Sequence, residues 1–220
     1  GATGSFWFAV NNRTDFAAFF GFAQMPKTFL GKAFIRNLVN EQKLLSLNGE
    51  QDDLFPIAPI SKANEQAKTL GANWKLTAIK DGGHNFMDGY PKEVADFYTE
   101  LLQEKRNPLP PNLFWQTDSE NSKANFWLKV TKLSSSEPAK VTAKYAANVF
   151  TIESSGAKEL QILLPFGSID YKKGVRVLVN NREVFNTKIK PDKNVIIEDF
   201  LGNRDREFLV TNKINITIEK

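Results

Sequence analysis

The hydrophobic pattern of the chain changes at a proline-rich stretch, Asn107-Pro108-Leu109-Pro110-Pro111. Before this stretch, short apolar runs alternate with segments patterned like amphipathic helices, and after it apolar and polar residues alternate with a period of two. The first pattern is typical of a parallel sheet covered by helices, and the second is typical of an antiparallel sandwich. We therefore expect two domains, residues 1–108 and residues 109–220, joined by this stretch.

The first domain is expected to contain three buried strands and two helices. The strands are expected over residues 15–23, 43–48 and 74–80, and the helices over residues 62–70 and 91–105. Ser61 is a suitable N-cap for the first of these helices, and Pro91 suits the first turn of the second.

The second domain is expected to contain short strands over residues 126–130, 140–144, 149–152, 160–164, 175–179, 195–197 and 214–218. Asn180-Asn181 is the best candidate for a hairpin turn, because asparagine accepts a positive φ angle. Alternation along the strands predicts inward-facing side chains at Phe126, Leu128, Val141, Ile152, Leu163, Val177 and Val179.

Composition excludes several classes of function. The 220 residues contain no cysteine, which removes disulfides, thiol catalysis and thiolate metal sites. The net charge of +4 comes from lysines scattered among acidic residues, so nucleic-acid binding is not expected. The longest apolar run, residues 16–23, is far shorter than a membrane span of about 20 residues.

Two short segments contain residue types suited to acid–base catalysis, and each reads as a loop that follows a buried strand. The first, residues 48–56, contains Asp52 and Asp53, and the second, residues 81–86, contains His84, the only histidine of the chain. An aspartate that accepts the Nδ1–H of a histidine fixes its tautomer and leaves Nε2 as a base. We expect Asp52 to be the acid, with Asp53 as the alternative, and Gly82 and Gly83 to let the second loop fold back. One imidazole with two carboxylates offers too few ligands for a metal site.

The pattern Gly49-x-x-Asp52 followed by Pro56, and then Gly82-Gly83-His84, resembles the acid and histidine loops of the α/β-hydrolase family over residues 1–106. The resemblance implies a serine hydrolase with Asp52 as the triad acid, His84 as the base and no cofactor. It also implies the fold class: the C-terminal part of an α/β-hydrolase parallel sheet with helices, followed by an antiparallel β-sandwich domain.

The first residues, Gly1-Ala2-Thr3-Gly4-Ser5, resemble the residues after the nucleophile of a Gly-x-Ser-x-Gly turn, with Gly1 as the last glycine of that motif. This resemblance places the nucleophile two positions before Gly1, in an N-terminal part of the same hydrolase domain that is then a required partner. Ser5 lacks flanking glycines and is not expected to be the nucleophile. The isolated chain is therefore expected to be inactive.

The second half resembles the β-sandwich appended to some bacterial esterases and peptidases, through Phe126-Trp127-Leu128 and residues 169–181. The implied substrates are small-molecule, peptide or polysaccharide esters and amides, and the implied location is periplasmic or secreted, with the cytoplasm left open. The alternative is a catalytically silent module that binds a glycan or a protein partner. Trp115 and Trp127 can form a sugar-stacking platform in that case, although packing is the simpler role.

Overall fold

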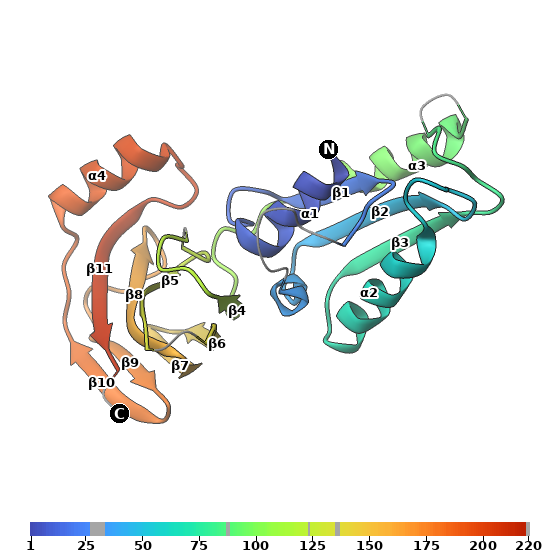
Figure 1. Cartoon of the computed structure of the whole chain (residues 1–220). Coiled ribbons are helices and arrows are strands. Elements are labelled where there is room, and N and C mark those ends of the chain that lie inside the picture. The colour runs from blue at the N-terminus through green and yellow to red at the C-terminus, as the bar shows by residue number, and fades with distance from the viewer. Residues whose placement is uncertain (27–33, 87–88, 123, 135–136, 219–220) are drawn as a thin grey trace. The chain divides into compact units, whose positions relative to one another are not determined.

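The computed structural model describes residues 1–26, 34–86, 89–122, 124–134 and 137–218. The chain divides into two compact units, Gly1–Asn107 and Pro108–Lys220 (Figure 1). None of the helices in the described ranges combines the length and apolarity that crossing a bilayer requires.

A parallel sheet of three strands forms the centre of the first unit (Figure 1). Its order is β1 (Ala18–Phe22), β2 (Lys43–Gly49) and β3 (Trp74–Ile79). The central strand is buried on both faces, with Leu44 directed to one apolar cluster and Leu45 and Leu47 to another. This explains why the segment is a nearly continuous apolar run rather than an alternating one.

Helices cover both faces of this sheet. On one face, α1 (Ala2–Asn11), the short 3₁₀ helix η1 (Ile35–Leu38) and α2 (Ile57–Thr69) share a core with β1, β2 and Trp74. On the other face, α3 (Pro91–Leu101) buries Val94 and Phe97. Glu100 of α3 also forms ion pairs with Lys43 of β2 and Lys75 of β3, which connect the helix to both strands.

Two sheets enclose the core of the second unit. The five-stranded sheet has the order β10 (Arg182–Thr187), β9 (Val175–Val179), β7 (Val149–Ser155), β6 (Ala139–Ala146) and β4 (Asn112–Thr117). The three-stranded sheet has the order β11 (Val210–Thr217), β8 (Ala157–Pro165) and β5 (Leu128–Leu133). Helix α4 (Lys193–Asn203) contacts β11 near the start of that strand (Figure 1).

Trp115 and Trp127 both belong to this core and are almost completely buried. The indole N–H of Trp127 donates to the carbonyl of Pro110 at 2.8 Å. These two side chains therefore form no exposed stacking platform.

The expected fold class is wrong. The described residues form a mixed α/β arrangement with three small sheets, not a hydrolase-type parallel sheet followed by an antiparallel sandwich. The parallel sheet has three strands in the described ranges, and the five-stranded sheet contains a parallel pair, β7 with β9. A period-two pattern predicts a strand but not the direction of its partner, since side chains alternate in the same way in both cases.

Three local predictions differ from the structure: two are wrong, and one differs only in where its helix begins. Residues 195–197 lie in α4 rather than in a strand, because the Asp192 side chain caps a helix there, accepting from the N–H of Asn194 at 2.8 Å. The helix expected over residues 62–70 begins earlier, at Ile57, with Pro56 rather than Ser61 at its N-cap. Leu163 is only partly buried, because alternation along β8 directs Leu160, Ile162 and Leu164 inward instead.

Candidate functional site

Asp52 lies in the loop between the carboxyl end of β2 and the start of α2, and only 3% of its surface is exposed. Its Oδ1 accepts hydrogen bonds from the backbone N–H of Leu54 at 3.0 Å and of Phe55 at 2.9 Å. These are the local side-chain-to-backbone bonds that aspartate favours in turns. They fix the orientation of the carboxylate through Oδ1.

His84 lies in the loop that follows β3 and precedes α3. The loop turns at Asp81, which has a φ of 55°, and the N–H of Gly83 donates to the hydroxyl of Tyr90 at 2.8 Å. The His84 side chain is 47% exposed. The imidazole is therefore held at the surface by a loop with ordered backbone contacts.

The two loops contact each other through their backbones. The N–H of Glu50 donates to the carbonyl of Ile79 at 3.0 Å, and the N–H of Gln51 donates to the carbonyl of Gly82 at 2.8 Å. A Cβ on Gly82 would lie 2.7 Å from Cγ2 of Ile79, whereas a Cβ on Gly83 would meet nothing within 4 Å. Of the two glycines expected to permit the fold-back, only Gly82 is thus required by close packing.

The structure brings Asp52 and His84 together. Oδ2 of Asp52 lies 2.9 Å from Nδ1 of His84, so the two groups are within hydrogen-bonding distance. Asp53, the alternative acid, is exposed, and the structure records no such contact for it in the described ranges.

Opposing effects act on the Asp52 carboxyl. Burial acts to raise its pKa, while the hydrogen bond from His84 and the backbone hydrogen bonds from Phe55 and Leu54 act to lower it. The charge of a protonated imidazole acts in the same direction as these bonds, and the net result is a pKa below the ordinary aspartate value. Asp52 therefore stays ionised at neutral pH and is available as an acceptor.

This arrangement selects one imidazole tautomer. An ionised carboxylate can only accept a hydrogen bond, so Nδ1 must carry the proton that it donates to Asp52. In the neutral imidazole Nε2 is then the unprotonated nitrogen, and in the described ranges no hydroxyl is recorded as bonded to it. The pair can act as a general base that is oriented and electrostatically supported by a buried acid.

The first turn of α1 lies at the carboxyl end of β1. A Cβ on Gly21 would be 2.8 Å from Cβ of Ala2, and the side-chain amide of Gln24 donates to the carbonyl of Ala2 at 3.4 Å. Because parallel strands share one carboxyl edge, Ala2 lies at the same edge of the sheet from which the Asp52 and His84 loops depart. Ser5 is directed elsewhere, since its Oγ accepts from the N–H of Phe20 at 3.2 Å.

Sequence reasoning missed a buried polar network beside this edge. The Trp74 indole N–H donates to Oγ of Ser46 at 2.8 Å, and the Ser46 hydroxyl in turn donates to the side-chain oxygen of Gln24. Gln24 and Ser46 are almost fully buried. The signal in the sequence was a polar residue inside the apolar run of β2, together with a glutamine directly after the apolar run of β1.

The chain matches neither a model of a known protein family nor a curated protein. In the described ranges, no three histidine, cysteine, aspartate or glutamate side chains gather as metal ligands. The Asp52–His84 pair is thus the feature of the described residues that points to a function.

Proposed function

We propose that Asp52 and His84 are the acid and the base of a serine hydrolase of the esterase or peptidase type, whose nucleophilic serine lies outside these 220 residues. The single observation that carries this proposal is the 2.9 Å contact between Oδ2 of Asp52 and Nδ1 of His84, with the imidazole half exposed. A buried, ionised acid behind an accessible histidine is the arrangement that acyl transfer needs.

In the proposed reaction, Nε2 of His84 removes the proton from the serine hydroxyl as its oxygen attacks the substrate carbonyl carbon. The imidazolium then returns that proton to the leaving alcohol or amine as the acyl bond breaks, which leaves an acyl-serine. Water attacks this ester in the same way and releases the acid. Asp52 stabilises the imidazolium at each stage through its contact with Nδ1.

The position of α1 supports a nucleophile close to Gly1. Ala2 packs against Gly21 at the carboxyl end of β1, so residues directly before α1 can reach the edge that carries the two loops. The resemblance of Gly1-Ala2-Thr3-Gly4-Ser5 to the residues after a Gly-x-Ser-x-Gly serine is consistent with this position. A helix N-terminus also offers backbone N–H groups to a developing oxyanion.

The test uses the chain together with the sequence that its gene encodes before Gly1. We expect that longer protein to hydrolyse p-nitrophenyl esters or peptide anilides, and His84→Ala to abolish turnover. Asn85→Ala, at an exposed neighbouring position, is the matched control and should leave turnover unchanged. Activity that survives His84→Ala, or the absence of a serine in the turn before Gly1, would overturn the proposal.

A further inference from the structure

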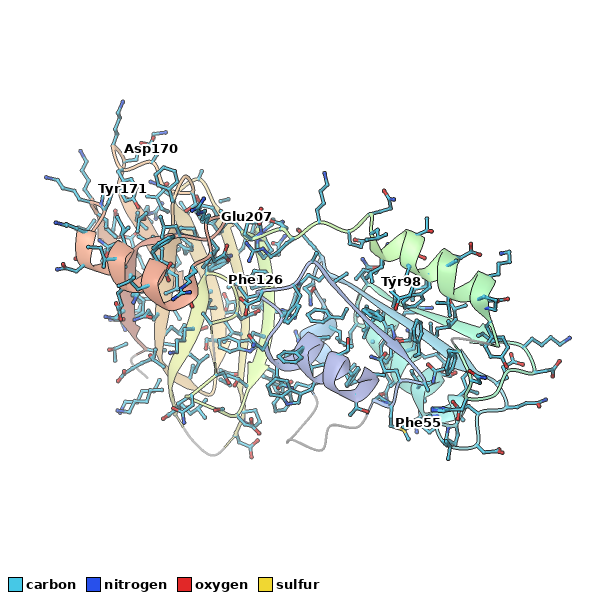
Figure 2. The ribbon with its side chains drawn as sticks, turned by 90° about the horizontal axis from the view of Figure 1, so that it is seen from above. Phe55, Tyr98, Phe126, Asp170, Tyr171 and Glu207 are labelled. Carbon is cyan, nitrogen blue, oxygen red and sulfur yellow. The ribbon has the colours of Figure 1, made fainter. Side chains whose placement is uncertain are left out.

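The His84 imidazole contacts two aromatic rings. The Phe55 ring stacks on it, with centroids 5.3 Å apart and planes inclined by 21°. The Phe86 ring approaches at 6.1 Å with planes inclined by 78°, an edge-on contact. Figure 2 labels Phe55, which belongs to the loop between β2 and α2. The imidazole thus has an aromatic contact from each of the two loops.

The two rings differ in what else they do. Phe86 is buried and stacks on Phe22 with an inclination of 14°, so the core itself requires its ring. Phe55 is only partly buried and packs at the margin of the same apolar cluster. Its ring has no other aromatic partner among the described residues, so its contact with His84 is its most specific one.

Phe55 also contacts the acid. Its backbone N–H donates to Oδ1 of Asp52 at 2.9 Å, while its side chain stacks on the imidazole that faces Oδ2. A single residue therefore restrains both partners of the pair, the carboxylate through the main chain and the imidazole through the ring.

We propose that Phe55 is a positioning residue of the Asp52–His84 pair. Its ring restricts rotation of the half-exposed imidazole and keeps Nδ1 on Oδ2 of Asp52, which keeps Nε2 directed to the open side of the site. Without the ring, the side chain of His84 samples rotamers in which Nδ1 leaves the carboxylate, and the tautomer preference weakens. The catalytic meaning of this restraint rests on the proposed function, but the restraint itself is a property of this chain.

The inference can be tested on the 220-residue chain, because its single histidine gives one set of imidazole signals. ¹⁵N NMR at about pH 8.5, above the range in which imidazole ordinarily titrates, distinguishes the Nδ1–H from the Nε2–H tautomer. We expect the wild-type chain to hold mainly the Nδ1–H tautomer. In Phe55→Leu the ratio of the two tautomers should shift toward Nε2–H by roughly 2- to 10-fold, the size of a lost aromatic contact.

Rescue separates positioning from general packing. Phe55→Tyr keeps the stacked ring and should restore the wild-type ratio, and Leu54→Ala, at the exposed neighbouring position, should not change it. If Phe55→Leu fails to fold, Phe55→Met provides a flexible apolar replacement of similar volume.

The outcomes also separate this inference from the proposed function. An unchanged ratio in a folded Phe55→Leu or Phe55→Met chain, or a ratio that Phe55→Tyr does not restore, contradicts the positioning role. A wild-type chain that holds mainly the Nε2–H tautomer contradicts the proposed function and the positioning role together, because both require Nδ1–H on Asp52.

Discussion

Gly49 at the end of β2 and Gly82 in the loop after β3 approach so closely that a Cβ on Gly49 would lie 2.2 Å from the carbonyl oxygen of Gly82. Only a residue without a side chain fits at this position. The same carbonyl accepts the N–H of Gln51 at 2.8 Å. This backbone contact holds the Asp52 loop against the His84 loop, three residues from the acid and two from the base.

Gly49→Ala should therefore destabilise the first unit by roughly 1–3 kcal/mol, the usual cost of forcing extra volume into a packed site. The measurement is urea unfolding followed through the NMR amide signals of β2. Gly83→Ala is the control, since its added methyl meets nothing within 4 Å and its N–H to Tyr90 is retained. Equal losses of unfolding free energy in Gly49→Ala and Gly83→Ala would show that the close approach of Gly49 to Gly82 does not stabilise the first unit.

The lowered pKa of Asp52 predicts how the stability of the first unit depends on pH. Because the pKa in the folded state is lower than in the unfolded state, the stabilisation is fully present above the ordinary aspartate value. It is lost as the pH falls through the folded-state value. The free energy of unfolding should thus decline between about pH 5 and about pH 2, the range in which such carboxylates take up protons.

In Asp52→Asn this decline should be shallower, because the substituted side chain does not titrate. The decline should not vanish, because a second carboxylate of the first unit contributes to it. Contacts with Lys75 and with Lys43 also lower the pKa of Glu100. Urea unfolding at a series of pH values measures both curves. Parallel curves for the two proteins would mean that Asp52 carries no such linkage.

The positions of the loops that carry Asp52 and His84 could be predicted from the sequence, because each loop follows an apolar run that reads as a buried strand. The sequence also identifies Asp52 and His84 as candidate site residues, and the structure places them in contact. The backbone contact between the two loops could not be predicted from the sequence. The close approach of Gly49 to Gly82 depends on the register of two strands that are far apart in the sequence. The stacking of Phe55 on His84 depends on the same register.

Less of the fold than of the site could be predicted from the sequence. Strands of the second unit are recognisable by alternation, but alternation carries no information about partner direction, so the parallel pairing of β7 with β9 was missed. The β-branched run Val195-Ile196-Ile197 predicted a strand, whereas the capping aspartate at position 192 starts a helix. Here a local hydrogen bond outweighs intrinsic propensity.

The buried network of Trp74, Ser46 and Gln24 provides a second stability prediction. Ser46→Ala leaves the Trp74 indole N–H without the acceptor that now lies at 2.8 Å, and it removes the donor to Gln24. An unsatisfied buried polar group costs about 1–3 kcal/mol. Thr99→Ala removes a hydroxyl that donates to the carbonyl of Ala95 on the exposed face of α3. Thermal unfolding should separate these variants clearly, and a Ser46→Ala loss no larger than the Thr99→Ala loss would contradict the importance of the network.

The hairpin between β9 and β10 turns at Asn180 and Asn181, which both have positive φ angles, 50° and 64°. Two such residues in a two-residue loop form a type I′ turn, for which glycine is also well suited. We expect Asn181→Gly to leave the second unit as stable or slightly more stable. Asn181→Ala should destabilise it by about 1–2 kcal/mol, the cost of a left-handed conformation for a residue with a Cβ. The urea midpoints of Asn181→Gly and Asn181→Ala measure these changes in stability. A higher midpoint for Asn181→Ala than for Asn181→Gly would contradict the type I′ turn.

The most direct test of the proposed function is the turnover of Asp52→Asn measured beside Asp53→Asn in the proposed longer protein that supplies the nucleophilic serine. The two substitutions are chemically identical and adjacent, but only Asp52 contacts Nδ1 of His84. We predict that Asp52→Asn lowers kcat for a p-nitrophenyl ester by roughly 10³- to 10⁴-fold, as loss of the correct tautomer does in other triads. Asp53→Asn should retain wild-type kcat. Equal activity of the two variants, or a larger loss in Asp53→Asn, would contradict the assignment of Asp52 as the acid that orients His84.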